Sequence, residues 1–290
     1  MPDSPAQIAL LVVELALLFS GAGLLLWLLG EPRRRQRWLS HQPLPHWPVT
    51  VPEFLFAGLL VFAGGFLGQT LVQTLAGARI AGATDRTGLE LFVYGAAFHL
   101  GILGGCALFP VLRRRLYSDY GSQPAPFRPG PTLPWTDITR YAAGTVLVAL
   151  PVLTVLSLGW TGLLRAAGLP DEPQDLIGIF SATQSPVIIA GMLLVACGLA
   201  PLSEELIFRA GLYRYLRQRL GRTPALLVSG VCFGALHGNW AGFLPLAVLG
   251  MILALAYEAT GSIRVAIVAH SLFNLNTVLI VLSGLPQASP

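Results

Sequence analysis

The sequence carries very little charge. Charged residues make up only 11% of the 290 positions, whereas a soluble domain usually carries about a quarter. Hydrophobic residues make up 54%, and the mean hydropathy is +0.68. This composition excludes an ordinary soluble domain and predicts a polytopic membrane protein, with the lipid bilayer as its surroundings.

Lysine is absent, so all 18 basic residues are arginines. Most of them lie beside apolar runs, and the formal net charge of the chain is +4. We interpret these arginines as signals of membrane orientation rather than as a nucleic-acid surface. No nucleic-acid partner is therefore expected.

Cysteine is also scarce. The three cysteines, Cys106, Cys197 and Cys232, each lie inside an apolar run. They are expected to be small core residues, and their spacing indicates neither a disulfide framework nor a metal cluster.

Eight apolar runs take up most of the chain, and most approach the roughly 20 helical residues that span a hydrocarbon core. They predict an all-α transmembrane bundle of about eight spans. Arginine clusters follow the first, third and fifth runs, so by the positive-inside rule those loops are cytoplasmic and the N-terminus and C-terminus lie outside. The predicted spans cover residues 7–30, 51–75, 87–112, 141–164, 186–202 with the polar stretch that follows, 224–240, 243–257 and 265–282.

The chain divides into two predicted regions, 1–185 and 186–284, each with about four spans. The segment 113–134, which begins with three arginines and is Pro- and Gly-rich over 123–134, is expected to be a cytoplasmic linker, and the acidic segment 171–175 an outer loop. The polar residues that suggest chemistry are concentrated in the second region.

A few small or polar residues stand out within the first four spans. Gly-x-x-x-Gly patterns at 64–68 and 101–105 predict close helix packing. Pro151 predicts a kink. Glu14 is expected to face the bundle with a hydrogen-bonding partner, and His99 to be a satisfied core histidine.

Charge of both signs appears at Glu204-Glu205-x-x-x-Arg209, in a region otherwise apolar enough to lie in lipid. Residues four apart share a helix face, so Glu205 and Arg209 are expected to pair. Glu204 is rotated by about 100° from its neighbour and is left free of the arginine. Ionisable groups at such depth point to function.

Two further patterns occur in later spans, Phe233-x-x-x-His237 and His270-x-x-x-Asn274. Counting residues from the nearest arginines, Glu204, His237, His270 and Asn274 can meet in one layer below the cytoplasmic surface. A glutamate can take a proton from water, a histidine can hold that water, and a histidine with an amide can donate to an oxyanion. The set predicts a hydrolytic site.

The three patterns, together with residues 257–263, resemble the CPBP intramembrane protease family, which includes the type II CAAX prenyl endopeptidases. The resemblance covers about residues 186–282. It implies an integral-membrane endopeptidase that cleaves a peptide bond at or within the membrane, with its site opening toward the cytoplasm. Catalysis would depend on Glu204 as general base, His237 as its assistant, and His270 with Asn274 as the oxyanion hole; the supporting residues would be Glu205, Arg209 and Phe233.

The sequence leaves open whether this site uses a metal. The family has been described both as metalloproteases and as glutamic proteases, and Glu204, His237 and His270 offer ligands that zinc accepts. The His-Glu-x-x-His pattern of zincins is absent, and the three residues come from three helices. A glutamic mechanism without a cofactor is therefore preferred, with zinc as the alternative.

Other classes of protein are also considered. The polar residues can tie the bundle together, the chain can be a non-proteolytic partner or bacteriocin-immunity protein that keeps the motif, or it can be a proton-coupled transporter. A transporter predicts repeat symmetry between the halves, which is not seen. The substrate is expected to be a membrane-presented peptide or protein, prenylated or a leader peptide, and the location a bacterial cytoplasmic (inner) membrane.

Overall fold

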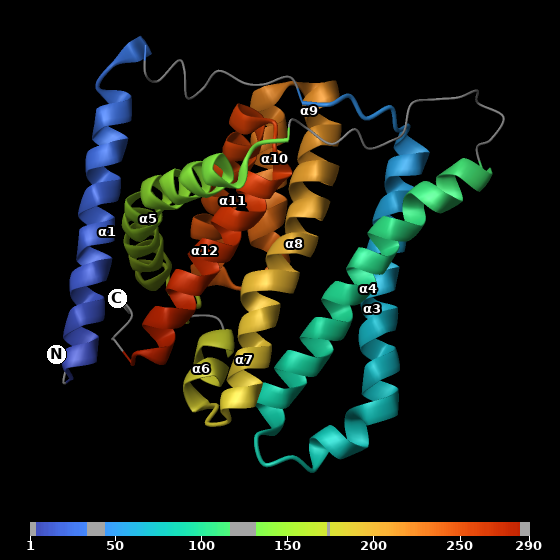
Figure 1. The fold of residues 1–290 in the computed structure, drawn as a ribbon, viewed down its shortest axis with the longest axis horizontal. Coiled ribbons are helices and arrows are strands. Elements are labelled where there is room, and N and C mark those ends of the chain that lie inside the picture. Colours follow the sequence, from blue (N-terminus) through green and yellow to red (C-terminus); the bar gives the residue numbers. More distant parts are fainter. Residues whose placement is uncertain (1–3, 34–43, 117–131, 173–174, 285–290) are drawn as a thin grey trace.

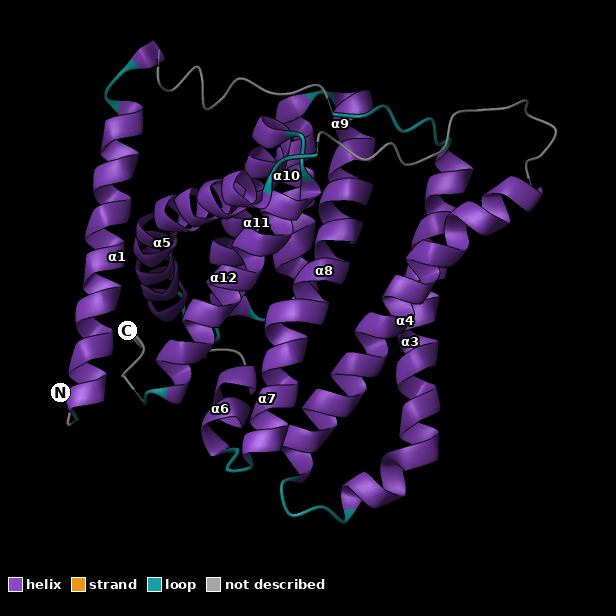
Figure 2. Cartoon of the chain, in the orientation of Figure 1, coloured by secondary structure: helices purple, strands orange, loops and turns teal. Residues whose placement is uncertain are grey.

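The computed structural model describes residues 4–33, 44–116, 132–172 and 175–284. Throughout these ranges the regular structure is helical, and they contain no strand (Figure 2). Within these ranges seven helices are long and apolar enough to cross a membrane, when the continuous helical stretch Pro186–Leu220 is counted as one. The all-α polytopic bundle is therefore confirmed.

Thirteen elements follow one another in the described ranges. The α-helices are α1 (Pro5–Leu29), α3 (Val51–Ala81), α4 (Arg86–Leu116), α5 (Trp135–Ala166), α6 (Asp175–Ala182), α7 (Pro186–Leu194), α8 (Ala200–Glu205), α9 (Arg214–Leu220), α10 (Arg222–Leu236), α11 (Trp240–Thr260) and α12 (Ile263–Leu282). Two π-helical segments, η1 (Val195–Leu199) and η2 (Leu206–Tyr213), join α7 to α8 and α8 to α9.

The sixth predicted span is shorter than expected. Helix α10 has 15 residues and ends at Leu236, not near Trp240. Gly238 follows with a φ of 62°, a left-handed conformation that glycine adopts without steric cost and that ends the helix. In the part of the chain that the structure describes, the bundle therefore has seven long apolar helices and one short one.

Helices α3 and α4 pack against each other along their glycines. A Cβ on Gly101 would lie 2.1 Å from the Gly64 carbonyl oxygen, and one on Gly68 would lie 2.6 Å from that of Ala97. Backbones this close leave no room for a side chain, so the predicted packing seam is confirmed. Helix α4 in turn packs on α7, η1 and α8 (Figure 1).

Helix α1 packs on α5 at the opposite side of the molecule (Figure 1). Helix α5 contains Pro151 and changes direction along its length, as the predicted kink requires. Glu14 of α1 accepts a hydrogen bond from Asn276 of α12 at 3.2 Å, so its predicted partner exists. Gln7 donates to the Ser283 carbonyl at 2.9 Å, which places the start of α1 beside the end of α12.

The arginines of α9 and α10 are not free in solvent. Glu258 of α11 accepts hydrogen bonds from Arg217 and Arg222, both at 2.7 Å. Arg219 stacks over the Tyr215 ring, and Arg214 is buried. These arginines therefore hold the connection between α9 and α10 in place, in addition to any role as signals of membrane orientation. Most of the first arginine cluster and most of segment 113–134 lie outside the described residues, and the membrane sidedness of the termini stays a prediction.

Candidate active site

Glu204 and Glu205 lie on α8, a short α-helical turn between two π-helical segments. Pro201 explains why the first π-helical segment, η1, forms. A proline has no N–H and its ring displaces the preceding turn, which favours a wider loop of backbone there. In η1 the Ala200 N–H donates to the Val195 carbonyl, five residues back. The two glutamates therefore begin a new helical register.

Glu205 is the centre of a buried polar cluster. Its Oε1 atom lies 2.8 Å from an Arg209 nitrogen and 2.9 Å from His270 Nδ1. Arg209 also donates to the Gly250 carbonyl at 3.2 Å. Since an ionised carboxylate only accepts, Nδ1 is the donor to Glu205, which fixes the orientation of the His270 ring. The predicted Glu205–Arg209 pair is present; the bond to His270 was not predicted.

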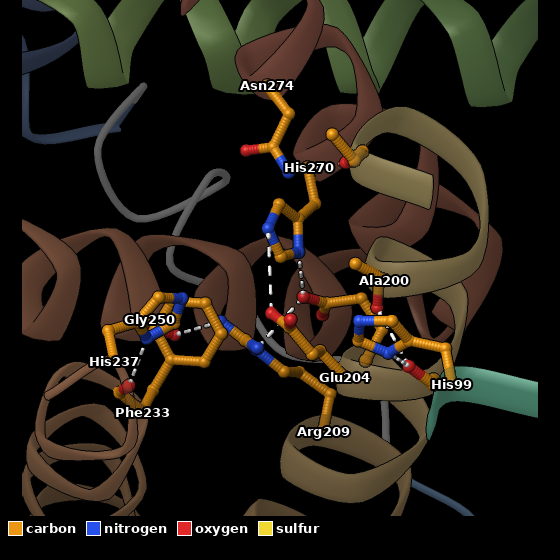
Figure 3. A network of polar contacts seen from close by, with 12 residues as sticks. His99, Ala200, Glu204, Arg209, Phe233, His237, Gly250, His270 and Asn274 are labelled. Atoms are coloured by element: carbon orange, nitrogen blue, oxygen red, sulfur yellow. Dashed lines mark hydrogen bonds and ion pairs between the residues drawn. The ribbon is translucent and has the colours of Figure 1, made fainter. Parts of the chain in front are cut away.

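Glu204 is placed differently. Its side chain is 20% exposed, and its Oε2 atom lies 3.9 Å from His270 Nε2, beyond hydrogen-bond distance. Among the described residues, Oε2 is buried and has no hydrogen-bond partner. Figure 3 shows Glu204 below the His270 ring. A buried carboxylate oxygen without a partner is costly, so this atom is expected to meet water or a ligand.

Phe233 contacts both histidines. It is fully buried, and its ring makes edge contacts with His237 at 4.9 Å and His270 at 5.7 Å between centroids. The Arg209 guanidinium lies over the same ring at 4.4 Å from the centroid. His237 Nδ1 donates to the Phe233 carbonyl at 2.7 Å, since a carbonyl only accepts. His237 Nε2 is thereby left as an acceptor.

Asn274 is anchored to η1. Its Nδ2 donates to the Ala196 carbonyl at 2.8 Å. Following the π-helical register, the backbone donor to that carbonyl would be residue 201, but Pro201 has no N–H. The proline thus leaves Ala196 free to hold the Asn274 amide, and the second amide hydrogen stays available. Asn274 and His270 share a face of α12 and come from one helix to the same site (Figure 3).

A metal set is not assembled here. Among the described residues, no three histidine, cysteine, aspartate or glutamate side chains are grouped closely enough to hold a metal. Glu204 and His270 approach one another at 3.9 Å, whereas His237 Nδ1 is bound to the Phe233 carbonyl. This arrangement brings together only two of the three proposed ligands, Glu204 and His270. The mechanism proposed for the site uses no metal.

His99 also belongs to this neighbourhood, although sequence reasoning did not place it there. Its Nδ1 lies 2.7 Å from the Oγ atom of Ser203, the residue directly before Glu204. The predicted hydrogen-bonding partner therefore exists, but it adjoins the candidate base. Helix α4 lies about a hundred residues earlier in the chain, and no local pattern connects a lone histidine to a distant serine.

The part of the chain that carries this geometry matches a known family model. Residues 186–276 match the type II CAAX prenyl endopeptidase Rce1-like family. They contain all of Glu204, Glu205, Arg209, Phe233, His237, His270 and Asn274. The resemblance predicted from the three motifs is confirmed, and with seven apolar helices the chain is an integral membrane protein.

Similarity to a curated protein covers less of the chain. The sequence is 32% identical over 112 residues to the Bacillus subtilis (strain 168) protein named "Putative membrane peptidase YdiL". The alignment covers 39% of this chain and 45% of that relative, less than half its length. No solved structure matches the chain. The family match therefore covers the C-terminal part of the chain, from residue 186 to residue 276.

Proposed function

We propose that the protein is an integral-membrane endopeptidase that hydrolyses peptide bonds with Glu204 as general base. One observation carries the proposal: Glu204 is partly exposed and its Oε2 atom has no hydrogen-bond partner among the described residues, whereas the fully buried Glu205 contacts Arg209 and His270 through Oε1. One carboxylate is thus free for chemistry, and the other is committed to support. The family name and the name of the curated relative support the same class of activity.

We propose that a water bridges Glu204 Oε2 and His270 Nε2, which lie 3.9 Å apart. A water about 2.8 Å from each atom satisfies both at ordinary hydrogen-bond length. As the water oxygen attacks the carbonyl carbon of the substrate, its proton passes to Glu204. His237, with Nε2 as an acceptor, assists by holding the water or by receiving the proton.

Attack places negative charge on the former carbonyl oxygen. His270 and Asn274 are proposed to donate to it, His270 from Nε2 and Asn274 from its second amide hydrogen. Because Nδ1 already donates to Glu205, donation from Nε2 requires a proton on both ring nitrogens. The carbon–nitrogen bond then breaks, and the leaving amine takes the proton that Glu204 accepted.

Glu205, Arg209 and Phe233 are proposed to support these groups without touching the substrate. Glu205 orients His270, Arg209 neutralises Glu205, and Phe233 contacts both histidines. We place the protein in the cytoplasmic membrane of a bacterium, with its site opening toward the cytoplasm. A bacterial relative and the arginine clusters near the site support this location.

The first experiment seeks the substrate and the activity together. Membrane peptides from cells that produce the wild type are compared by proteomics with those from cells that produce Glu204→Gln. Peptides that accumulate only with the variant are then offered to purified protein in liposomes, beside a farnesylated peptide that ends in Cys-aliphatic-aliphatic-Met. That prenyl peptide decides whether the substrate is prenylated or is a leader peptide or other membrane protein.

We expect Glu204→Gln and His237→Ala to lower kcat by about 10²–10⁴-fold, the usual contribution of general acid–base catalysis. The matched control is Glu90→Gln on α4, which removes a carboxylate paired only with Arg86 in the same helix. Unchanged melting temperatures show that the variants are folded. Full activity of both site variants refutes the assignment, and no Glu204-dependent cleavage of any peptide favours a non-proteolytic partner.

A further inference from the structure

His99 lies outside the Rce1-like segment, and its hydrogen-bond partner Ser203 lies inside it. His99 is on α4, and its partner Ser203 is on α8, 104 positions later. The distance of 2.7 Å between Nδ1 and Oγ is that of a strong hydrogen bond. Ser203 itself is fully buried. This contact joins the N-terminal region to the residue directly before Glu204.

The direction of the bond follows from the other contact of Ser203. Its Oγ lies 3.1 Å from the Ala200 carbonyl, which only accepts, so the single hydroxyl hydrogen goes there. The serine oxygen is then the acceptor of His99 Nδ1–H. The imidazole donates, and its Nε2 is free of that bond.

Glu204 lies between histidines from two helices. His270 of α12 approaches Oε2 at 3.9 Å, and His99 of α4 contacts Ser203, the residue directly before Glu204. Figure 3 shows His99 beside the Glu204 segment, on the side away from His237. The two π-helical segments interrupt the regular hydrogen bonding on both sides of α8. Because the backbone hydrogen bonding on both sides of α8 is irregular, the position of α8 depends more on its contacts with other helices.

We propose that His99 is a positioning residue that holds Ser203 and thereby sets the place of the Glu204 carboxylate. The inference rests on the proposed endopeptidase activity and adds to it a contribution from the N-terminal region. A small displacement of a reacting group costs up to about a hundredfold in rate. The hydrogen bond acts on Glu204 through the backbone shared by positions 203 and 204.

Four variants of the full-length protein in liposomes separate positioning from simple helix packing. His99→Ala removes the donor, and Ser203→Ala removes the acceptor. His99→Asn keeps an N–H at the place of Nδ1, because the amide nitrogen lies the same number of bonds from Cα, but it has no Nε2. His46→Asn, at an exposed histidine before α3, is the matched control for the substitution.

Kinetics are measured on the peptide whose cleavage depends on Glu204, at a temperature well below every variant's melting point. We expect His99→Ala and Ser203→Ala each to lower kcat about ten- to hundredfold, with KM changed by less than about threefold. The double variant is expected to be no slower than either single one, since both remove the same bond. His99→Asn is expected to restore most of kcat, and His46→Asn to match the wild type.

Three results overturn the inference. They are wild-type kcat in His99→Ala while Glu204→Gln is inactive, additive losses in the double variant, or a loss in His99→Asn as large as in His99→Ala. A variant that melts early but keeps its kcat shows that the bond only packs helices, which also overturns it. If the wild type itself cleaves no peptide in a Glu204-dependent manner, the proposed function fails first and the inference falls with it.

Discussion

Glu205 and Arg209 form an ion pair of 2.8 Å, and their side chains are 0% and 1% exposed. Both charges are taken out of water; the Gly250 carbonyl accepts a hydrogen bond from Arg209, and His270 contacts Glu205. A buried pair of this kind is costly to break, because the remaining charge has no water to replace its partner.

Arg209→Met is therefore expected to destabilise the protein by about 3–5 kcal/mol. The double variant Glu205→Gln with Arg209→Met is expected to recover much of that stability, since no unpaired charge is left. Activity is not expected to return, because His270 loses its carboxylate partner. Melting temperature and peptide cleavage are measured on the same samples. Equal stability of single and double variants contradicts the expectation.

Pro201→Ala tests the origin of the Asn274 contact. The substitution adds an N–H in register with the Ala196 carbonyl, which then competes with Asn274 Nδ2 for that oxygen. We expect a loss in kcat smaller than that of Asn274→Ala, and a double variant no slower than Asn274→Ala alone. Pro110→Ala, inside α4, is the control. Independent, additive effects on kcat would show that the proline acts elsewhere.

Gly101→Ala tests whether the α3–α4 seam positions helix α4. The added Cβ would lie 2.1 Å from the Gly64 carbonyl oxygen, so the helices must separate. We expect destabilisation of about 1–3 kcal/mol. Gly104→Ala on the same helix is the matched control, because a Cβ there meets nothing within 4 Å. Thermal unfolding in liposomes measures both, and an unaltered Gly101→Ala protein would argue against the seam.

Metal removal tests the glutamic mechanism. Activity is expected to survive exhaustive chelation, because the proposed steps use only Glu204, His237, His270 and Asn274 as proton carriers and hydrogen-bond donors. Cleavage is measured before chelation, after it, and after zinc is added back. Loss of activity that zinc restores rejects the mechanism without a cofactor and favours a ligand set that assembles on binding.

Sequence patterns predicted the contacts that lie within one helix. The spacing of Glu205 and Arg209 places them on one face, and both the pairing and the separate position of Glu204 follow from 3.6 residues per turn. The apolar runs predicted the long helices because length and composition alone determine whether a helix can cross a membrane. Helix α10 was overestimated, since an apolar run does not reveal where a glycine ends the helix.

Contacts between helices were harder to predict. The bond from His270 to Glu205 joins positions 65 apart, and the bond from His99 to Ser203 joins positions 104 apart. Nothing in the local sequence distinguishes such partners from the many others that a bundle can bring together. The oxyanion role given to His270 and Asn274, the part played by His237 and the division at residue 185 all stay predictions.

A π-helical turn is an α-helix that carries one additional residue, and α8 has such a turn on both sides. The direction in which the side chains of α8 point is therefore set independently of α7, whose own apolar pattern determines which of its faces meets the bundle and which meets lipid. Loss of a single residue from η1 would rotate Glu204 and Glu205 by about 100° relative to α7. Among relatives, a one-residue gap at this point of an alignment would mark proteins in which the carboxylates no longer meet the histidines, however well the surrounding residues are kept.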